Sequence, residues 1–354
     1  MSKFLSQKLL SLKPYVPGEQ PRDKKYIKLN TNESPYPPSP KVVSAINSEE
    51  IKDLRLYSDP DLKVLTETIA DYFGVDKNCV FCGNGSDEVL SFAFLAWGDK
   101  GVTFPSISYG FYPVFAQLYN LNYTTVALKK DFSLDLTDFD GKGGLIVFAN
   151  PNAPTGLSAP LSSIEDLLIK NPESIVLVDE AYVDFGGESA VSLIEKYNNL
   201  IVVRTFSKSR QLAGARLGFA MANEELVSDL NRIKFSFNPY NVNRLTAIAG
   251  AEAIKDDTWF KECVFKIINT RGRLTAELRN LGFNVIESRA NFVFAEHPQL
   301  PGDTLYTKLK EKGILIRRFN IKTIENYSRI TIGTDNETDR LFDVIKEILQ
   351  EVSK

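Results

Sequence analysis

The segment from residue 79 to residue 222 alternates short apolar runs with stretches of helical periodicity, and this alternation limits the fold more than any other feature. The apolar runs have the length of buried strands: NCVFCG near 79, KGVTF at 100, LNYTTVAL at 121, GLIVFAN at 144, SIVLVDE at 174, LIVVRTF at 200 and RLGFAMA at 216. Between them lie helical patterns such as SDEVLSFAFLAW, YGFYPVFAQLY and LSSIEDLLI. Strands separated by helices predict crossover connections and a largely parallel sheet covered on both faces.

From about residue 241 the pattern changes to long helical stretches followed by short strands and a closing helix. The strand candidates are FNVIES, NFVFAE, GILIRRF and SRITIGT. This order is typical of a smaller α+β domain. The proline-rich start predicts a loop-like segment that wraps around the rest. We therefore divide the chain into an N-terminal arm (1–35), a large domain (36–250) and a small C-terminal domain (251–354).

Composition narrows the class of protein. The net charge of −3 is spread over 42 basic and 45 acidic residues without blocks of one sign, which disfavours binding to nucleic acid or to an acidic membrane surface. The opening MSKFLSQKLLSLKPY lacks the features of a signal peptide, and no apolar run reaches the roughly 18 residues that span a bilayer. With only three cysteines, the sequence predicts a cytoplasmic protein.

The cysteines include a Cys-x-x-Cys pair, Cys79 and Cys82. If CVFC is a strand, the two thiols point to opposite faces and cannot share a metal. His297 is the only histidine, which excludes a histidine-based triad or a multi-histidine metal site. We therefore predict no metal.

Four loops that follow predicted strands carry the polar residues that suit a ligand: CGNGSDEVL, VFANPNAPTG, VLVDEAYVDF and TFSKSRQLAGAR. Ligands of open parallel sheets bind outside the carboxyl ends of the strands. The first loop is a glycine turn at a helix start, which favours a phosphate but is also typical of an ordinary capped helix. Asp179 ends a buried strand, where an ionised carboxylate needs a cation, although a structural ion pair also fits.

Lys208 lies between two serines in the last loop, and Arg216 follows it. A desolvated lysine near other cations loses proton affinity and becomes a nucleophilic amine that can form a Schiff base. A single ligand can use all of these protein groups if it carries a phosphate, a ring nitrogen that stays protonated opposite a carboxylate, and an aldehyde that the lysine amine can attack. That ligand is pyridoxal 5'-phosphate.

The chain resembles the fold type I pyridoxal-phosphate aminotransferases and, among them, the histidinol-phosphate aminotransferases. The matching motifs occur in family order: KLNTNESPYPPSP at 28, YSDP at 57, GNGSDE at 83, PSISYGFY at 105, NPNAPTG at 150, VDEAYVDF at 178, RTFSKSRQLAGARLGF at 204, NPYNVN at 238, GILIRRF at 313 and RITIGT at 329. The resemblance implies a three-layer α/β/α large domain with a mostly parallel mixed sheet, plus a smaller α+β domain.

The resemblance also implies roles. Lys208 is expected to form the Schiff base and to move the substrate proton, Asp179 to hold the pyridine nitrogen protonated, and Tyr182 to hydrogen-bond the ring's phenolic oxygen. Tyr109 is expected to stack on the ring. The phosphate ligands are expected to be Gly85, Ser86, Asp87, Thr205, Ser207 and Arg216, with Tyr57 reaching the phosphate from the other subunit of a homodimer.

One position departs from the family pattern. The asparagine that usually precedes Pro-Thr-Gly is replaced by Ala153, and the neighbouring Asn152 is the candidate substitute. For the substrate, Arg329 matches an arginine that binds the glutamate carboxylate. Arg317 matches one that binds the phosphate of the phospho-substrate, although Arg318 is an alternative. Further candidate contacts are Tyr15, Asn32 and Tyr240.

The resemblance therefore predicts ping-pong transamination of L-histidinol phosphate and 2-oxoglutarate to imidazole-acetol phosphate and L-glutamate, a step of histidine biosynthesis. Two alternatives share the scaffold: an aromatic amino acid aminotransferase and a phosphothreonine decarboxylase-like enzyme.

Overall fold

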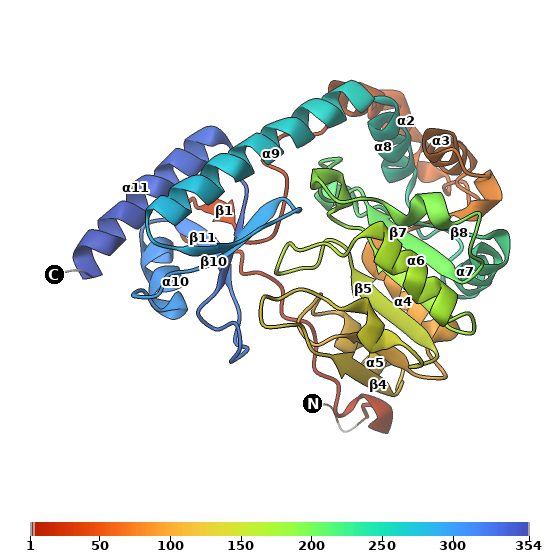
Figure 1. Cartoon of the computed structure of the whole chain (residues 1–354). Coiled ribbons are helices and arrows are strands. Elements are labelled where there is room, and N and C mark those ends of the chain that lie inside the picture. Colours follow the sequence, from red (N-terminus) through yellow and green to blue (C-terminus); the bar gives the residue numbers. More distant parts are fainter. Residues whose placement is uncertain (1, 3, 353–354) are drawn as a thin grey trace.

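Seven strands form the larger of two sheets in this computed structural model, which describes residues 2 and 4–352 (Figure 1). Their order in the sheet is β2-β8-β7-β6-β5-β3-β4. The bounds are β2 Val80–Gly83, β3 Val102–Pro105, β4 Tyr123–Val126, β5 Leu145–Ala149, β6 Ile175–Asp179, β7 Leu200–Thr205 and β8 Gly218–Ala222. Strand β8 is antiparallel to both neighbours, and the other pairs are parallel. The predicted alternation is confirmed, since each apolar run became a strand.

Helices cover both faces of this sheet. Helices α3 (Lys63–Phe73), α6 (Leu161–Lys170) and α8 (Arg244–Lys255) share a core with Ile146 and Phe148. Helices α4 (Ser86–Trp97), α5 (Tyr112–Leu118) and α7 (Glu224–Phe237) share another with Leu145 and Val147. Successive residues of β5 thus point to opposite faces, and both faces are apolar because both are covered. The predicted three-layer arrangement is confirmed.

The second sheet has the order β1-β11-β12-β10-β9. Its strands are β1 Ile27–Leu29, β9 Asn284–Ile286, β10 Phe292–Glu296, β11 Ile314–Arg318 and β12 Ser328–Thr331. The long helix α9 (Asp257–Asn280) runs from the region of α8 to this sheet (Figure 1). It packs there with α10 (Gly302–Glu311) and α11 (Asp335–Val352) in a separate apolar core.

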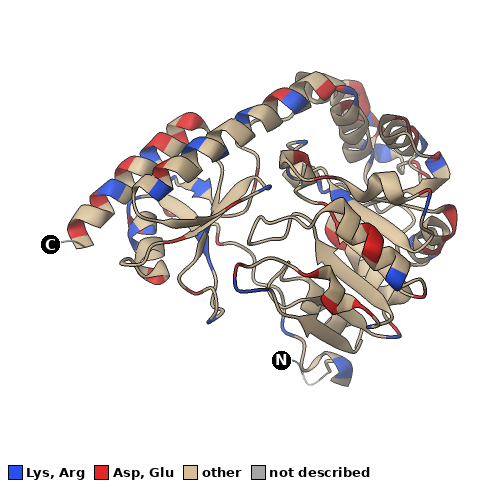
Figure 2. Ribbon diagram, viewed as in Figure 1, with Lys and Arg blue, Asp and Glu red and all other residues tan. Residues whose placement is uncertain are grey.

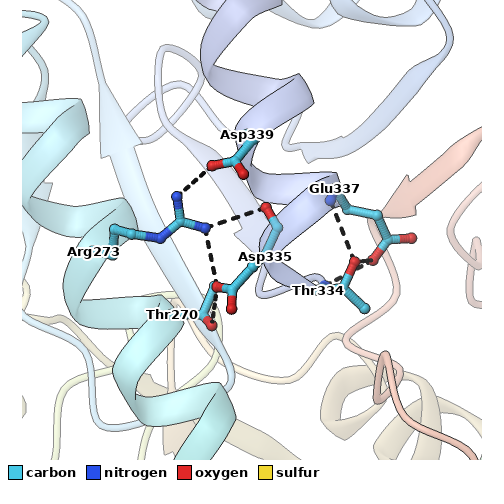
Figure 3. Close-up of polar contacts among 6 residues, drawn as sticks. All are labelled: Thr270, Arg273, Thr334, Asp335, Glu337 and Asp339. Carbon is cyan, nitrogen blue, oxygen red and sulfur yellow. Dashed lines mark hydrogen bonds and ion pairs between the residues drawn. The ribbon is translucent and has the colours of Figure 1, made fainter.

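Helix α11 begins with a reciprocal cap (Figure 3). The N–H of Thr334 donates to the Glu337 carboxylate at 2.8 Å, and the N–H of Glu337 donates to the Thr334 hydroxyl at 3.3 Å. This pairing satisfies N–H groups that a helix start leaves free. Arg273 of α9 joins the two helices through Asp335, at 3.0 Å, and Asp339.

The N-terminal arm differs from its predicted loop-like form. Residues 27–29 form β1, which pairs in parallel with β11 at the edge of the second sheet. Before that strand, Glu19 accepts hydrogen bonds from Tyr306 and, at 2.5 Å, from Lys310 of α10. Tyr15 instead stacks on Phe111 beside α5, with ring centroids 4.2 Å apart. The arm therefore crosses from one sheet to the other. The three domain boundaries stay a prediction.

The CVFC segment is only partly a strand. Cys79 ends the 3-10 helix η3 (Lys77–Cys79), and Cys82 lies buried in β2. Within residues 2 and 4–352, no cluster of three or more His, Cys, Asp or Glu side chains could hold a metal ion. No helix in that part of the chain has the length and apolarity needed to cross a membrane. Acidic and basic side chains are interspersed along α9 and α11 (Figure 2).

Candidate active site

The parallel strands β5, β6 and β7 end at Ala149, Asp179 and Thr205, which lie at one edge of the larger sheet. A cavity of about 300 Å³ opens there. Its polar lining includes Ser86, Asp87, Tyr109, Asp179, Tyr182, Thr205, Ser207, Lys208 and Arg216. The structure thus brings together most of the side chains that the four loops predict. A larger hollow of about 480 Å³ between α3 and α7 lies away from this edge and contains charged side chains of both signs.

Lys208 points into the cavity, and its Nζ donates to the carbonyl of Thr31 at 3.2 Å. Burial and, to a smaller extent, the neighbouring Arg329 guanidinium lower the pKa of Lys208 to about 8. Both effects disfavour the charged ammonium. A fraction of the Lys208 amine is therefore uncharged near neutral pH.

Asp179 is only 4% exposed, and no ion pair satisfies it among the described residues. Its carboxylate accepts from the Tyr112 hydroxyl at 2.9 Å and from the N–H of Ala181 at 3.2 Å. Burial raises the pKa of Asp179 to about 6, even though these two hydrogen bonds oppose the rise. Sequence reasoning missed Tyr112, which lies at the start of α5, where the only signal was an apolar helical pattern.

The cavity extends to a recess at the start of α4, which Ser86 and Arg216 line. Gly85 is its N-cap with a φ of +81°, and a Cβ there would lie 2.7 Å from the Arg216 guanidinium. At Gly218 of β8 a Cβ would lie 2.2 Å from the Ser86 nitrogen. Glycine at these two positions lets β8 and the Arg216 guanidinium approach the start of α4 closely, so that a cation lies beside a helix start, whose N–H groups favour an anion.

The backbone N–H of Asp87 belongs to the helix start, whereas its carboxylate pairs with Arg216 at 3.1 Å and accepts from the Tyr109 hydroxyl at 2.7 Å. These contacts hold Tyr109 against the cavity. The Thr205 hydroxyl accepts from the N–H of Ser207 at 3.1 Å, which fixes the turn before Lys208.

The Asn152 amide faces away from the cavity. It donates to the carbonyl of Ile107 at 3.1 Å and accepts from the Ser108 hydroxyl at 2.7 Å. Ala153 lines the cavity in its place. Asn152 is thus placed to shape the loop wall.

A second cavity of about 310 Å³ adjoins the first and shares Lys208, Tyr109 and Tyr182 with it. Its other polar lining residues include Tyr15, Asn30, Asn32, Arg317 and Arg329. Arg317 and Arg329 are paired across β11 and β12, so their side chains share one face of the sheet. Arg318 is the next residue on β11 and points to the other face.

Tyr57 and Tyr240 lie outside both cavities. Tyr57 is 80% exposed and stacks on Tyr240, with ring centroids 4.5 Å apart. The structure therefore does not bring either ring to the Lys208 site of its own chain.

A buried ionic network lies next to Asp179 and Lys208, and sequence reasoning missed it. Arg204 of β7 pairs with Glu180 at 3.6 Å and with Asp184, and the Ser209 hydroxyl donates to Asp184 at 2.5 Å. Glu180 follows Asp179 in the chain, and Ser209 follows Lys208. Burial raises the pKa of Glu180 to about 7, although Arg204 opposes the rise. The network fixes the backbone on either side of the cavity.

Comparison with known proteins agrees with this geometry. The family described as aminotransferase class I and II matches residues 24–345. The histidinol-phosphate aminotransferase of Brachyspira hyodysenteriae is 51% identical over 353 residues, which cover 99% of this chain and 100% of that protein. That of Clostridium botulinum (strain Kyoto / Type A2) is 50% identical over 354 residues, with the same coverage.

A solved structure shows the same fold. The histidinol-phosphate aminotransferase from Sinorhizobium meliloti, in complex with pyridoxal-5'-phosphate, has a TM-score of 0.90 and 24% identity, and the match covers 99% of both chains. The chain therefore belongs to the class I and II aminotransferases and, within them, to the histidinol-phosphate aminotransferases.

Proposed function

We propose that this protein is a cytoplasmic, homodimeric enzyme that uses pyridoxal 5'-phosphate to interconvert L-histidinol phosphate and 2-oxoglutarate with imidazole-acetol phosphate and L-glutamate, in histidine biosynthesis. Relatives named histidinol-phosphate aminotransferase are about 50% identical to this chain over their full length. The single observation that carries the reaction type is the cavity that Lys208 and Asp179 line together with the helix start at Ser86 and with Arg216.

The residues at the cavity fit the cofactor by their chemistry. The helix start at Ser86, with Arg216 and the hydroxyls of Thr205 and Ser207, offers the donors that a phosphate accepts. Asp179, which has no cationic partner among the described residues, would hold the ring nitrogen. When bound, pyridoxal 5'-phosphate supplies an aldehyde for amines and a protonated ring that draws electrons from the substrate Cα.

We assign the proton transfer to Lys208. With a pKa near 8, its amine can take a proton from the substrate Cα and return it at a neighbouring carbon of the cofactor. Tyr182 would donate to the phenolic oxygen of the ring, and Tyr109 would stack on it. Thr31 and Glu33 of the arm line this cavity, and Tyr15 of the arm with Arg317 and Arg329 of the second sheet line the adjoining one.

The substrate side offers guanidinium groups for two anions. Arg329 would bind a carboxylate of glutamate, and Arg317 the phosphate of histidinol phosphate. The register that pairs Arg317 with Arg329 favours Arg317 over Arg318. Tyr15 lines the same cavity from the arm and would pack against the substrate.

The exposed Tyr57 supports a homodimer in which each site takes one ring from the other subunit. Exposed apolar side chains accompany it on nearby segments: Leu54, Leu56 and Phe237. A mixing experiment tests this arrangement. Chains carrying Lys208→Ala and chains carrying Tyr57→Ala should each be weak alone, and mixed dimers should regain activity because one site then holds both intact residues. Failure of the mixture to gain activity would argue against a shared site.

The substrate is tested by the half-reaction. Histidinol phosphate alone should bleach the visible absorbance of the cofactor-loaded enzyme, and added 2-oxoglutarate should restore it. Bleaching by phenylalanine but not by histidinol phosphate would favour the aromatic aminotransferase. Release of carbon dioxide from phosphothreonine would indicate the decarboxylase. Unchanged absorbance with every amine would reject the proposed function.

A further inference from the structure

Asn32 occupies an unusual place between the two sheets. It follows β1 with a φ of +57°, a left-handed conformation that asparagine tolerates better than most residues. Its side chain is buried and lies between Tyr182, after β6 of the larger sheet, and Thr331, at the end of β12. Asn291 also donates to the Asn32 carbonyl at 3.0 Å. Hydrogen bonds therefore hold both the backbone and the side chain of Asn32 in place.

The hydrogen bonds around Asn32 have a defined direction. The N–H of Asn32 donates to the Thr331 hydroxyl at 3.0 Å, so the Thr331 oxygen acts there as an acceptor. The Thr331 hydroxyl in turn donates its proton in a hydrogen bond to Asn32 Oδ1, also at 3.0 Å. With Oδ1 committed as an acceptor, the Nδ2 of Asn32 faces Tyr182 and donates to its Oη at 2.9 Å.

This direction determines what Tyr182 can do. A phenol has one proton to donate, and Asn32 Nδ2 has no lone pair to accept it. In the described part of the chain, the bond from Asn32 is the only hydrogen bond that the Tyr182 hydroxyl makes. Burial raises the pKa of Tyr182, so its proton is present at neutral pH. That proton is left to point into the cavity that Tyr182 lines.

The loop that contains Asn152 and Ala153 provides no asparagine amide as a second hydrogen-bond donor beside the Tyr182 hydroxyl. Ala153 lines both cavities but has no polar side-chain atom, and the Asn152 amide donates to Ile107 and Thr155 instead. The direction of the Tyr182 hydroxyl consequently matters more than it would beside a second donor.

We propose that Asn32 is a positioning residue that turns the Tyr182 hydroxyl into a hydrogen-bond donor toward the ring oxygen of the cofactor, with Thr331 fixing the orientation of its amide. This inference rests on the proposed function, and it replaces the expected substrate contact at Asn32. It also links the second sheet to the cofactor cavity, because Thr331 belongs to β12.

The test uses the pH midpoint of the visible absorbance of the cofactor-loaded enzyme, measured without substrate. A donor at the ring oxygen withdraws negative charge that otherwise stabilises a nearby proton, so its loss should raise the midpoint by about one pH unit. Thr331→Val should raise it by freeing the amide to turn its oxygen toward Tyr182, without any change of charge. Thr331→Ser is the matched control that keeps the hydroxyl and the wild-type midpoint.

Asn32→Asp provides a second arm, because aspartate also tolerates this φ and its carboxylate only accepts. Its added charge can raise the midpoint by itself, so the variant is repeated in a Tyr182→Phe background. The inference expects a smaller shift there than with Tyr182 intact, because only the effect of the added charge remains. A shift of the same size without the hydroxyl would overturn it, as would an unchanged midpoint in Thr331→Val.

A substrate contact gives a different pattern. If Asn32 binds substrate, KM rises while the substrate-free midpoint stays at its wild-type value, and that result would also overturn the inference. Thermal unfolding of each variant, with and without cofactor, identifies misfolded proteins, and Thr331→Val decides the matter if Asn32→Asp does not fold. A wild-type enzyme that shows no cofactor absorbance at any pH would reject the proposed function itself.

Discussion

The two walls of the joined cavities satisfy their polar groups in different ways. On the wall built from the larger sheet, Asp179 accepts from Tyr112, and Asp87 accepts from Tyr109 and Arg216. On the wall built from the arm and the second sheet, the Nε of Arg329 and the Oδ1 of Asn30 are buried and have no hydrogen-bond partner among the described residues.

This difference indicates that the first wall is formed before its ligand arrives, whereas the second is completed by its ligand. Side chains that hold one another lose little conformational freedom when the cofactor binds. A buried guanidinium nitrogen without a partner costs free energy until an anion or water supplies one. The first wall, which we call the cofactor wall, can thus stay fixed while two different anionic substrates alternate at the second, the substrate wall.

The largest effect is expected at Lys208, which both walls share. Lys208→Ala should lower kcat by about a thousandfold or more, because the proton transfer loses its base. The cofactor should still bind through the recess at Ser86 and Arg216, which equilibrium dialysis can measure. Lys196→Ala, at an exposed lysine paired with Glu165, is the matched control. Normal turnover in Lys208→Ala would refute the proposed mechanism.

The ionic network behind the cofactor wall should be the next most sensitive place. Asp184→Asn leaves the buried Arg204 with Glu180 as its only acidic partner and should lower the free energy of unfolding by about 3 kcal/mol, as expected for a broken buried pair. Asp138→Asn breaks an exposed pair with Lys129 and should cost less than about 1 kcal/mol. Equal losses of unfolding free energy for the two variants, measured by urea unfolding, would show that the buried network stabilises the fold no more than an exposed ion pair does.

The substrate wall is tested by exchanging its arginines. Arg329→Lys should raise KM for glutamate about tenfold to a hundredfold, because lysine cannot make the bidentate hydrogen bond of a guanidinium to a carboxylate. The affinity for the cofactor should hardly change. Arg318→Lys, on the opposite face of β11, is the control. If cofactor affinity falls as much as KM rises, the two walls are not independent.

Much of the fold follows from local pattern. The strands of the larger sheet other than β4 are buried on both faces, so their apolar runs are visible in the sequence. Strand β1 was missed because three residues, IKL, carry no periodicity, and only their pairing with β11, nearly 300 residues away, makes them a strand. Cys79 was assigned to a strand because a Val and a Phe follow it, whereas the cap at Asp76 draws it into η3.

The site was predictable where strand ends place residues, as for Lys208, Asp179 and Arg216. It was not predictable where partners meet through tertiary contacts. Tyr112 reaches Asp179 across 67 residues, and Asn32 reaches Tyr182 across 150. The commitment of Asn152 to the Ser108 loop likewise depends on how two loops pack, which the motif NPNAPTG alone does not reveal.

The smallest expected effect concerns the charge on the cofactor wall. Asp179 must be ionised to hold a protonated ring nitrogen, and its pKa is raised to about 6. The folded protein without cofactor therefore takes up a proton there as the pH falls through 6. Below that midpoint, cofactor affinity should drop about tenfold for each pH unit through this group.

The cofactor phosphate also titrates near pH 6, so the comparison needs a variant. Asp179→Asn should bind more weakly at pH 8 and should lose the part of the pH dependence that belongs to the carboxylate. Fluorescence titrations between pH 5 and pH 8 measure both curves. Parallel curves for the wild type and Asp179→Asn would show that the phosphate alone sets the pH dependence, and that the burial of Asp179 does not tune cofactor binding.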